Sequence, residues 1–193
     1  RRGRGRKKKF KLTGIIDIRI ECNRKWKHFY SITTYAYRRY IKLMELVSAT
    51  EDENDLLNFY SDIIRIVFND QIEEEDIEQL DVAEITGIFK VVTEIIDTCI
   101  NEKIRSIGEL LNGTQVEMKE GSAFDEYDRE NGYINEETQE EAWRSYGKAL
   151  DSILQICIKN MRNSYKDCLE SDLSDLLDYV IFQVEYDREQ VKE

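Results

Sequence analysis

The sequence predicts a mostly helical α+β protein, with an N-terminal β-hairpin, a helical bundle and a C-terminal helical segment. Three observations lead to this fold class. The 193 residues include no proline, which favours long helices because proline inside a helix costs about 3 kcal/mol. Apolar residues recur at helical spacing over most of the chain. A short stretch near the N-terminus alternates apolar and polar residues instead, as half-buried strands do.

The alternating stretch predicts two strands. Apolar and charged side chains alternate in residues 12–22, and residues 26–32 place Trp26, His28 and Tyr30 on one side. Residues 23–25 form the expected turn between the two strands. We therefore expect an antiparallel hairpin, with His28 as a packed or surface strand residue.

From a predicted helix cap at Thr33 or Thr34 onward, the apolar residues recur at helical spacing. Thr50 with Glu53, and later Asp81 with Glu84, match capping boxes that open new helices. Apolar stripes at helical spacing occupy residues 36–47, 56–67, 85–100, 142–157 and 173–184. Gly108, or Gly113 if the helix continues, is expected to end the third of these helices.

Composition divides the chain into four parts: a basic arm at residues 1–9, a domain at 10–111, an acidic Gly-containing linker at 112–137 and a C-terminal helical segment at 138–193. Two helices alone bury too little apolar surface to be stable. The C-terminal pair is therefore expected to pack on the first half, on another copy or on a partner.

The charge distribution is strongly polarised. Residues 1–42 hold 15 Lys+Arg and two acids, whereas residues 43–193 hold 13 Lys+Arg and 38 acids, so the two parts carry +13 and −25. Head-to-tail self-association through the opposite charges is one consequence. The alternative is that the basic arm folds back over its own acidic body.

Cysteine and histidine usage argues against several classes of site. The scattered Cys22, Cys99, Cys157 and Cys168 form no CxxC pair, and His28 is the only histidine. A structural zinc site is not expected, and the cysteines are predicted to be reduced core residues of a cytosolic protein. The abundant acids leave an enzyme that uses carboxylates and a metal as a third hypothesis, but we expect no enzyme and no cofactor.

Two further classes are not indicated. No apolar run is long enough to cross a membrane, and no secretory signal is recognised. Asn131-Gly132 matches the centre of a calcium-binding loop, but Tyr127, Arg129 and Thr138 then occupy ligand positions that require other oxygen donors. We expect a turn there.

The basic arm leaves three interpretations open. It neutralises nucleic-acid phosphates, it docks on an acidic protein surface, or it is a solubilising tail. The cations are Arg1, Arg2, Arg4, Arg6, Lys7, Lys8 and Lys9.

Four segments carry a resemblance to a known family. They are FKLTGIIDIRIE (10–21), ITTYAYRRYIKLMEL (32–46), FYSDIIRIVFNDQ (59–71) and EEEDIEQLDVAEI (73–85). Together they make residues 10–107 resemble the tail assembly chaperones of long-tailed bacteriophages. Residues 112–137 and 164–186 resemble the extension that the longer, frameshifted form of these chaperones carries.

The resemblance implies a non-enzymatic role in the cytoplasm of an infected bacterium. Such chaperones keep the long, helical tape measure protein soluble, and the longer form recruits tail tube protein. Self-association is expected as well, and nucleic-acid binding through the arm is the alternative function. The residues expected to contact a partner are Tyr35, Tyr37, Arg38, Arg39, Trp143, Tyr146, Leu173 and Leu177.

Overall fold

The computed structural model describes residues 18–22, 25–69, 71–112, 138–160 and 162–191, and these are mostly helical, as predicted. The basic arm, most of the predicted linker and the calcium-loop-like turn lie outside the described residues. The elements are β1 (Ile18–Cys22), β2 (Lys25–Phe29), α1 (Thr34–Ala49), α2 (Glu53–Val67), α3 (Glu74–Ile77), α4 (Val82–Ile96), the π-helical turn η1 (Asp97–Asn101), α5 (Glu102–Asn112), α7 (Gln139–Asn160), α8 (Tyr165–Glu170) and α9 (Leu173–Val191).

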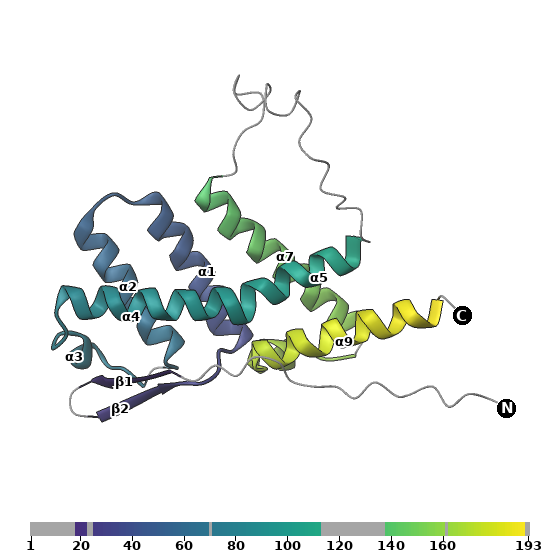
Figure 1. The fold of residues 1–193 in the computed structure, drawn as a ribbon, viewed down its shortest axis with the longest axis horizontal. Coiled ribbons are helices and arrows are strands. Elements are labelled where there is room, and N and C mark those ends of the chain that lie inside the picture. Colours follow the sequence, from purple (N-terminus) through teal and green to yellow (C-terminus); the bar gives the residue numbers. More distant parts are fainter. Residues whose placement is uncertain (1–17, 23–24, 70, 113–137, 161, 192–193) are drawn as a thin grey trace, which may run out of the picture.

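The helices form two crossed groups (Figure 1). Helices α1, α2 and α7 lie on one side, with α1 packed against both of the others. The continuous run α4–η1–α5 crosses in front of them, and α9 packs along α5. Of the three arrangements expected for the C-terminal helices, the structure has the first, since α7 and α9 pack on the first half of the chain.

The two strands pair antiparallel, with Ile18 opposite Phe29 and Cys22 opposite Lys25. The connecting residues 23–24 and the expected start of the first strand lie outside the described residues, so the complete hairpin stays a prediction. The second strand ends at Phe29 and does not reach residue 32, since the carbonyl of Ile32 accepts instead from the backbone N–H of Leu173 at the start of α9.

A side-chain amide docks β2 on the helices. Gln71 donates from Nε2 to the carbonyl of His28 at 2.9 Å and accepts from the backbone N–H of His28 at 3.2 Å. Lys27 Nζ lies 3.2 Å from the buried Asp76 carboxylate. The Gln71 amide thus pairs the backbone N–H and carbonyl of His28 as a neighbouring strand would, and the ion pair adds a side-chain contact.

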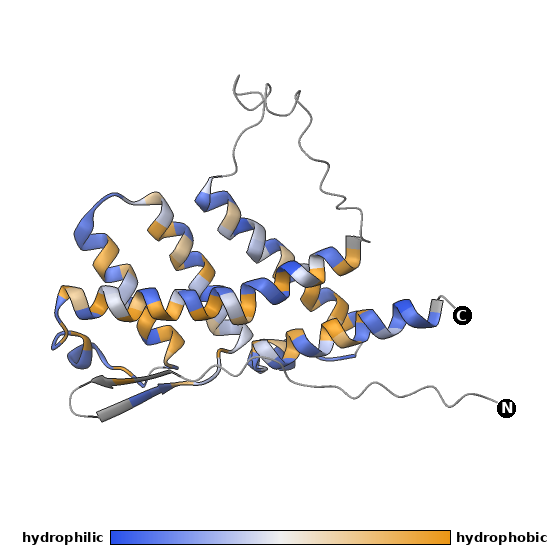
Figure 2. Ribbon diagram, in the orientation of Figure 1, coloured by the Kyte–Doolittle hydropathy of each residue, from blue (hydrophilic) through white to orange (hydrophobic). Residues whose placement is uncertain are grey.

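One hydrophobic core joins the two halves of the chain. Amphipathic helices carry alternating hydrophilic and hydrophobic residues, and α9 becomes hydrophilic toward its C-terminal end (Figure 2). The largest fully buried residues come from both halves: Tyr37, Tyr40, Phe29, Phe68, Ile32, Ile63, Ile64, Ile72, Ile96, Ile100, Ile107 and Leu150.

The helix caps agree with the sequence in two places and differ in one. Thr33 accepts from the N–H of Ala36, and Asp81 forms the predicted capping box with Glu84. The box predicted at Thr50 is wrong, because Asp52 accepts from the first backbone N–H groups of α2. Helix α5 continues past Gly108 to Asn112.

A mostly buried ion pair fixes α9 on α5. Lys103 Nζ lies 2.8 Å from Asp178 Oδ1, and only 11% and 5% of these side chains are exposed. Lys103 also donates to Ser174 Oγ at 2.8 Å. Removing one partner would leave a buried charge uncompensated.

We expect Asp178→Ala to lower the free energy of unfolding by about 3 kcal/mol, measured by urea denaturation. Glu170→Ala is the matched control, since Glu170 pairs with Lys166 in an exposed i,i+4 bridge and should cost at most about 0.5 kcal/mol. Equal losses in the two variants would contradict a structural role for the buried pair.

Candidate protein-binding groove

An open groove of about 500 Å³ runs between α1, α7 and α8. It combines aromatic, cationic and aliphatic side chains, which are the groups that anchor many protein interfaces. The lining residues are Tyr35, Arg38, Arg39, Ile41, Lys42 and Glu45 from α1, Gly147 and Asp151 from α7, and Tyr165 and Leu169 from α8.

Arg38 joins the three helices that form the groove. Its guanidinium donates to Asp151 on α7 and to the Tyr165 hydroxyl on α8. The guanidinium carbon also lies 5.9 Å from the centre of the Tyr165 ring, within cation–π range. Arg38 thus holds the Tyr165 ring at the rim of the groove.

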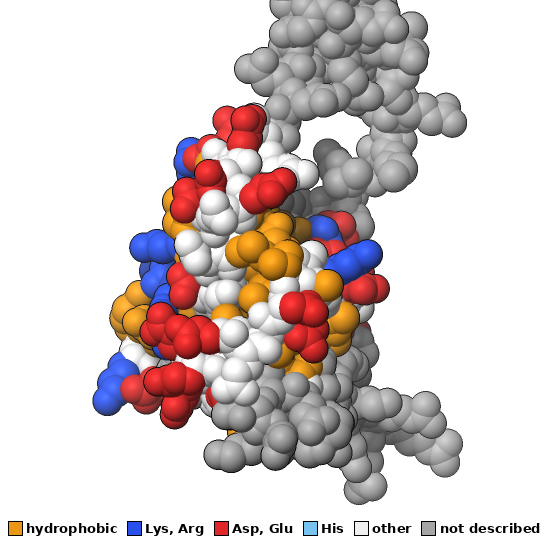
Figure 3. Space-filling model, turned by 90° about the vertical axis from the view of Figure 1, so that its left-hand side faces the viewer, with side chains coloured by type: hydrophobic (Ala, Val, Ile, Leu, Met, Phe, Trp, Pro, Cys, Tyr) orange, Lys and Arg blue, Asp and Glu red, His pale blue; other side chains and the backbone are white. Residues whose placement is uncertain are grey.

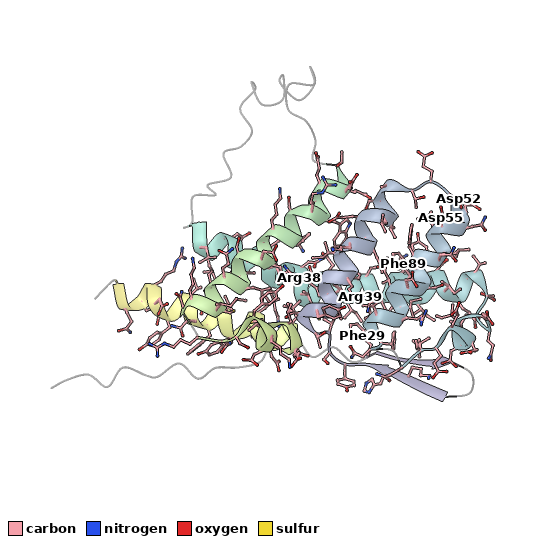
Figure 4. The ribbon with its side chains drawn as sticks, turned by 180° about the vertical axis from the view of Figure 1, so that it is seen from behind. Phe29, Arg38, Arg39, Asp52, Asp55 and Phe89 are labelled. Carbon is pink, nitrogen blue, oxygen red and sulfur yellow. The ribbon has the colours of Figure 1, made fainter. Side chains whose placement is uncertain are left out.

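Arg39 continues the cationic surface toward α2. Figure 4 shows Arg38 and Arg39 on α1, with Arg39 nearer α2. The guanidinium of Arg39 lies 6.0 Å from the ring centre of Tyr35, a side chain that is 57% exposed. Arg39 also lines an adjoining hollow of about 330 Å³ with Lys42 and Arg65.

The predicted partner-binding residues separate into three groups. Tyr35, Arg38 and Arg39 line the groove. Tyr37, Leu173 and Leu177 have no exposed surface and belong to the core, because helical spacing placed them on buried faces. Trp143 and Tyr146 are half-buried on α7.

A polar network connects Tyr37 with Tyr146 beneath α1. The Tyr37 hydroxyl donates to Asn101 Oδ1 at 2.6 Å, and Asn101 Nδ2 donates to Asp97 at 3.1 Å. Arg105 then donates to Asp97 at 3.4 Å and to the Tyr146 hydroxyl at 2.9 Å. Asp97 and Asn101 both belong to the π-helical turn η1.

An aromatic cluster lies beside this network. The Trp143 ring meets the Tyr40 ring edge-on at 5.7 Å and lies 5.7 Å from the Tyr146 ring. The Tyr40 hydroxyl is buried and accepts or donates no hydrogen bond in the described structure. Trp143 and Tyr146 therefore act as packing residues that attach α7 to α1 and α5.

Burial changes the ionisation of both tyrosines on α1. Desolvation raises the pKa of Tyr37 well above its ordinary value, and the neighbouring Tyr40 adds to the shift. Desolvation also raises the pKa of Tyr40, with a contribution from the Asp97 carboxylate. Both phenols are thus held neutral in the folded protein.

The described cysteines are free thiols, with Cys157 and Cys168 buried and Cys99 half-buried. Burial, with a smaller contribution from the nearby Cys168, raises the pKa of Cys157 to about 11. Reactive cysteines need the thiolate, so Cys157 does not have the properties of a nucleophile. For these three residues, the prediction of reduced thiols agrees with the structure.

Within the described ranges, no group of three or more His, Cys, Asp or Glu side chains is arranged to hold a metal ion. None of the helices that the structure describes has the length and apolar character needed to cross a membrane.

Comparisons with protein-family models, curated proteins and solved structures find no match for this chain.

The sequence analysis named Tyr35, Arg38 and Arg39 and missed the other seven residues of the groove, among them Lys42, Asp151 and Tyr165. Lys42 follows Arg38 by one helical turn, so helical spacing was enough to place it on the same face, and the signal was overlooked. Asp151 and Tyr165 join the groove only because α7 and α8 pack on α1. No local pattern in the sequence indicates that packing.

The two buried tyrosines provide a matched test of the network. We expect Tyr37→Phe to lower the free energy of unfolding by about 1 kcal/mol, because Asn101 loses its donor. Tyr40→Phe should be neutral or stabilising by up to about 1 kcal/mol, since it removes an unpaired buried hydroxyl. Urea denaturation of both variants decides this, and losses of the same sign and size would contradict the network.

Alkaline unfolding should report the raised tyrosine pKa values. A group whose pKa is raised by folding contributes its full stability below its unfolded pKa, about 10 for tyrosine, and loses it as the pH rises further. We expect helical circular dichroism to fall above about pH 10. The tyrosinate absorbance of the buried tyrosines should appear only as the helical signal is lost. Tyrosinate formation by every tyrosine without loss of helix would contradict this expectation.

Proposed function

We propose that this chain is a non-enzymatic tail assembly chaperone that binds a tape measure protein and recruits tail tube subunits. The α1–α7–α8 groove is the observation that carries the proposal. It is open along one side, and Tyr35 and Tyr165 are 57% and 49% exposed at its rim. An amphipathic client helix can bury apolar side chains in such a groove.

The groove chemistry also supports a charged helical client. Arg39 and Lys42 face the opening from α1, so they can pair with acidic side chains that flank the apolar stripe of the client. Tyrosine and arginine are the residues that most often dominate interface energetics. A groove of this size offers contacts of moderate strength, which suits a client that must be released during assembly.

The surface composition is consistent with holding an aggregation-prone client in solution. Charged residues make up 35% of the chain, and the net charge is −12, a charge that opposes precipitation. The proposal also includes self-association of the chaperone and its action in the cytoplasm of the infected bacterium. It assumes that residues 12–29 form the complete N-terminal hairpin. Recruitment of tail tube protein is assigned to the C-terminal segment by resemblance alone.

The test is a pull-down from phage-infected cells, with the purified full-length chain as bait and mass spectrometry as the readout. We expect recovery of one very long, helix-rich phage protein, and we expect this recovery to survive deletion of residues 1–9. The double variant Tyr35→Ala/Arg39→Glu should reduce recovery by about tenfold or more, because such residues are typical interface hot spots.

The matched control is Tyr186→Ala/Lys90→Glu, which replaces an exposed tyrosine of α9 by alanine and an exposed cation of α4 by glutamate. This control should bind like the unmodified chain. Recovery of nucleic acid alone, with a steep salt dependence that disappears when residues 1–9 are deleted, would contradict the chaperone proposal and favour the nucleic-acid alternative.

A further inference from the structure

The crossing of α2 and α4 leaves apolar side chains at the surface. Val82, at the first position of α4, is 60% exposed. Leu56, Tyr60 and Phe89 are only half-buried, and the rings of Tyr60 and Phe89 stack with their centres 3.8 Å apart. We call these four residues the α2–α4 face.

Acidic residues surround this face. Residues 51–94 contain 14 acids and two basic residues, a net charge of −12. Asp52 and Asp55 are exposed at the start of α2, and Glu78 and Asp81 are exposed just before α4. Figure 3 shows apolar side chains gathered on this side of the molecule with acidic side chains around them. A ligand that fits must be both basic and partly apolar.

The same chain contains one segment of that chemistry. Residues 1–12 hold eight Lys+Arg, no acid, and the apolar Phe10 and Leu12. No other stretch of this length in the chain combines so many cations with an absence of acids. Its charge is opposite to that of residues 51–94, so attraction between the two is expected at moderate ionic strength.

The attachment point of this segment lies beside α2. Ile18, the first described residue, pairs with Phe29, and the Phe29 ring lies 5.7 Å from the Phe68 ring at the end of α2. The eight residues 10–17 can extend over about 26 Å, whereas a 15-residue helix such as α2 is about 22 Å long. The chain is therefore long enough to cover the α2–α4 face of its own body.

We propose that residues 1–12 dock on the α2–α4 face of the same molecule, with Phe10 against the apolar residues and the Lys and Arg side chains on the surrounding acids. The docked segment covers the apolar surface and neutralises much of the local negative charge. This inference is independent of the client-binding groove, because α1, α7 and α8 form that groove.

Photo-crosslinking of the full chain tests the docking. Phe10 is replaced by benzoylphenylalanine, the protein is irradiated at low salt, and crosslinked peptides are identified by mass spectrometry. We expect crosslinks to peptides from α2 and α4, reduced about threefold or more at high salt because the charge attraction is screened. An equal mixture with isotope-labelled chains should give crosslinks within single chains only.

Paired charge variants provide the control. Asp55→Asn/Glu78→Gln removes two charges beside the α2–α4 face and should lower the crosslink yield about threefold. Glu102→Gln/Glu109→Gln removes two exposed charges from α5 and should leave the yield unchanged. Circular dichroism confirms that both variants remain folded. Crosslinks to other helices or to a second chain, no crosslinks, or equal yields in the two variants would overturn the proposal.

Discussion

Helix α1 is buried on two sides at once, and the arrangement of the other helices depends on this. It packs against α2 on one side and α7 on the other, and its side chains Tyr37 and Tyr40 have no exposed surface. Two large phenols cannot be buried without a partner for at least one hydroxyl. The hydrogen bond from Tyr37 to Asn101 meets this requirement and ties α1 to η1.

The π-helical turn gives this contact its position. A single extra residue in the turn rotates the following helix relative to the preceding one, so that Asn101 faces α1 while Ile104 and Ile107 of α5 remain in the core. Helix α9 then packs along α5 through apolar residues and the buried Lys103–Asp178 pair. The long central helix therefore connects two packing layers that come from distant parts of the sequence.

Burial of two sides of α1 leaves one strip of this helix to solvent, and that strip carries Tyr35, Arg39 and Lys42. Because α7 and α8 border it, the strip becomes one wall of a groove. The α2–α4 face lies on other helices and has the opposite charge. A chain with a net charge of −12 thus presents two surfaces of different chemistry, one suited to an acidic amphipathic helix and one suited to a basic segment.

The helices could be predicted from local patterns, because apolar periodicity and caps such as Asp81–Glu84 act within a few residues. The predicted partner-binding residues Tyr35, Arg38 and Arg39 line the groove in the structure. Packing between distant segments makes Tyr37, Leu173 and Leu177 core residues. The same packing brings Asp151 and Tyr165 into the groove. A stripe at helical spacing shows that one face is apolar. Which partner covers that face depends on contacts between residues 64 to 127 positions apart, and local patterns do not encode those contacts.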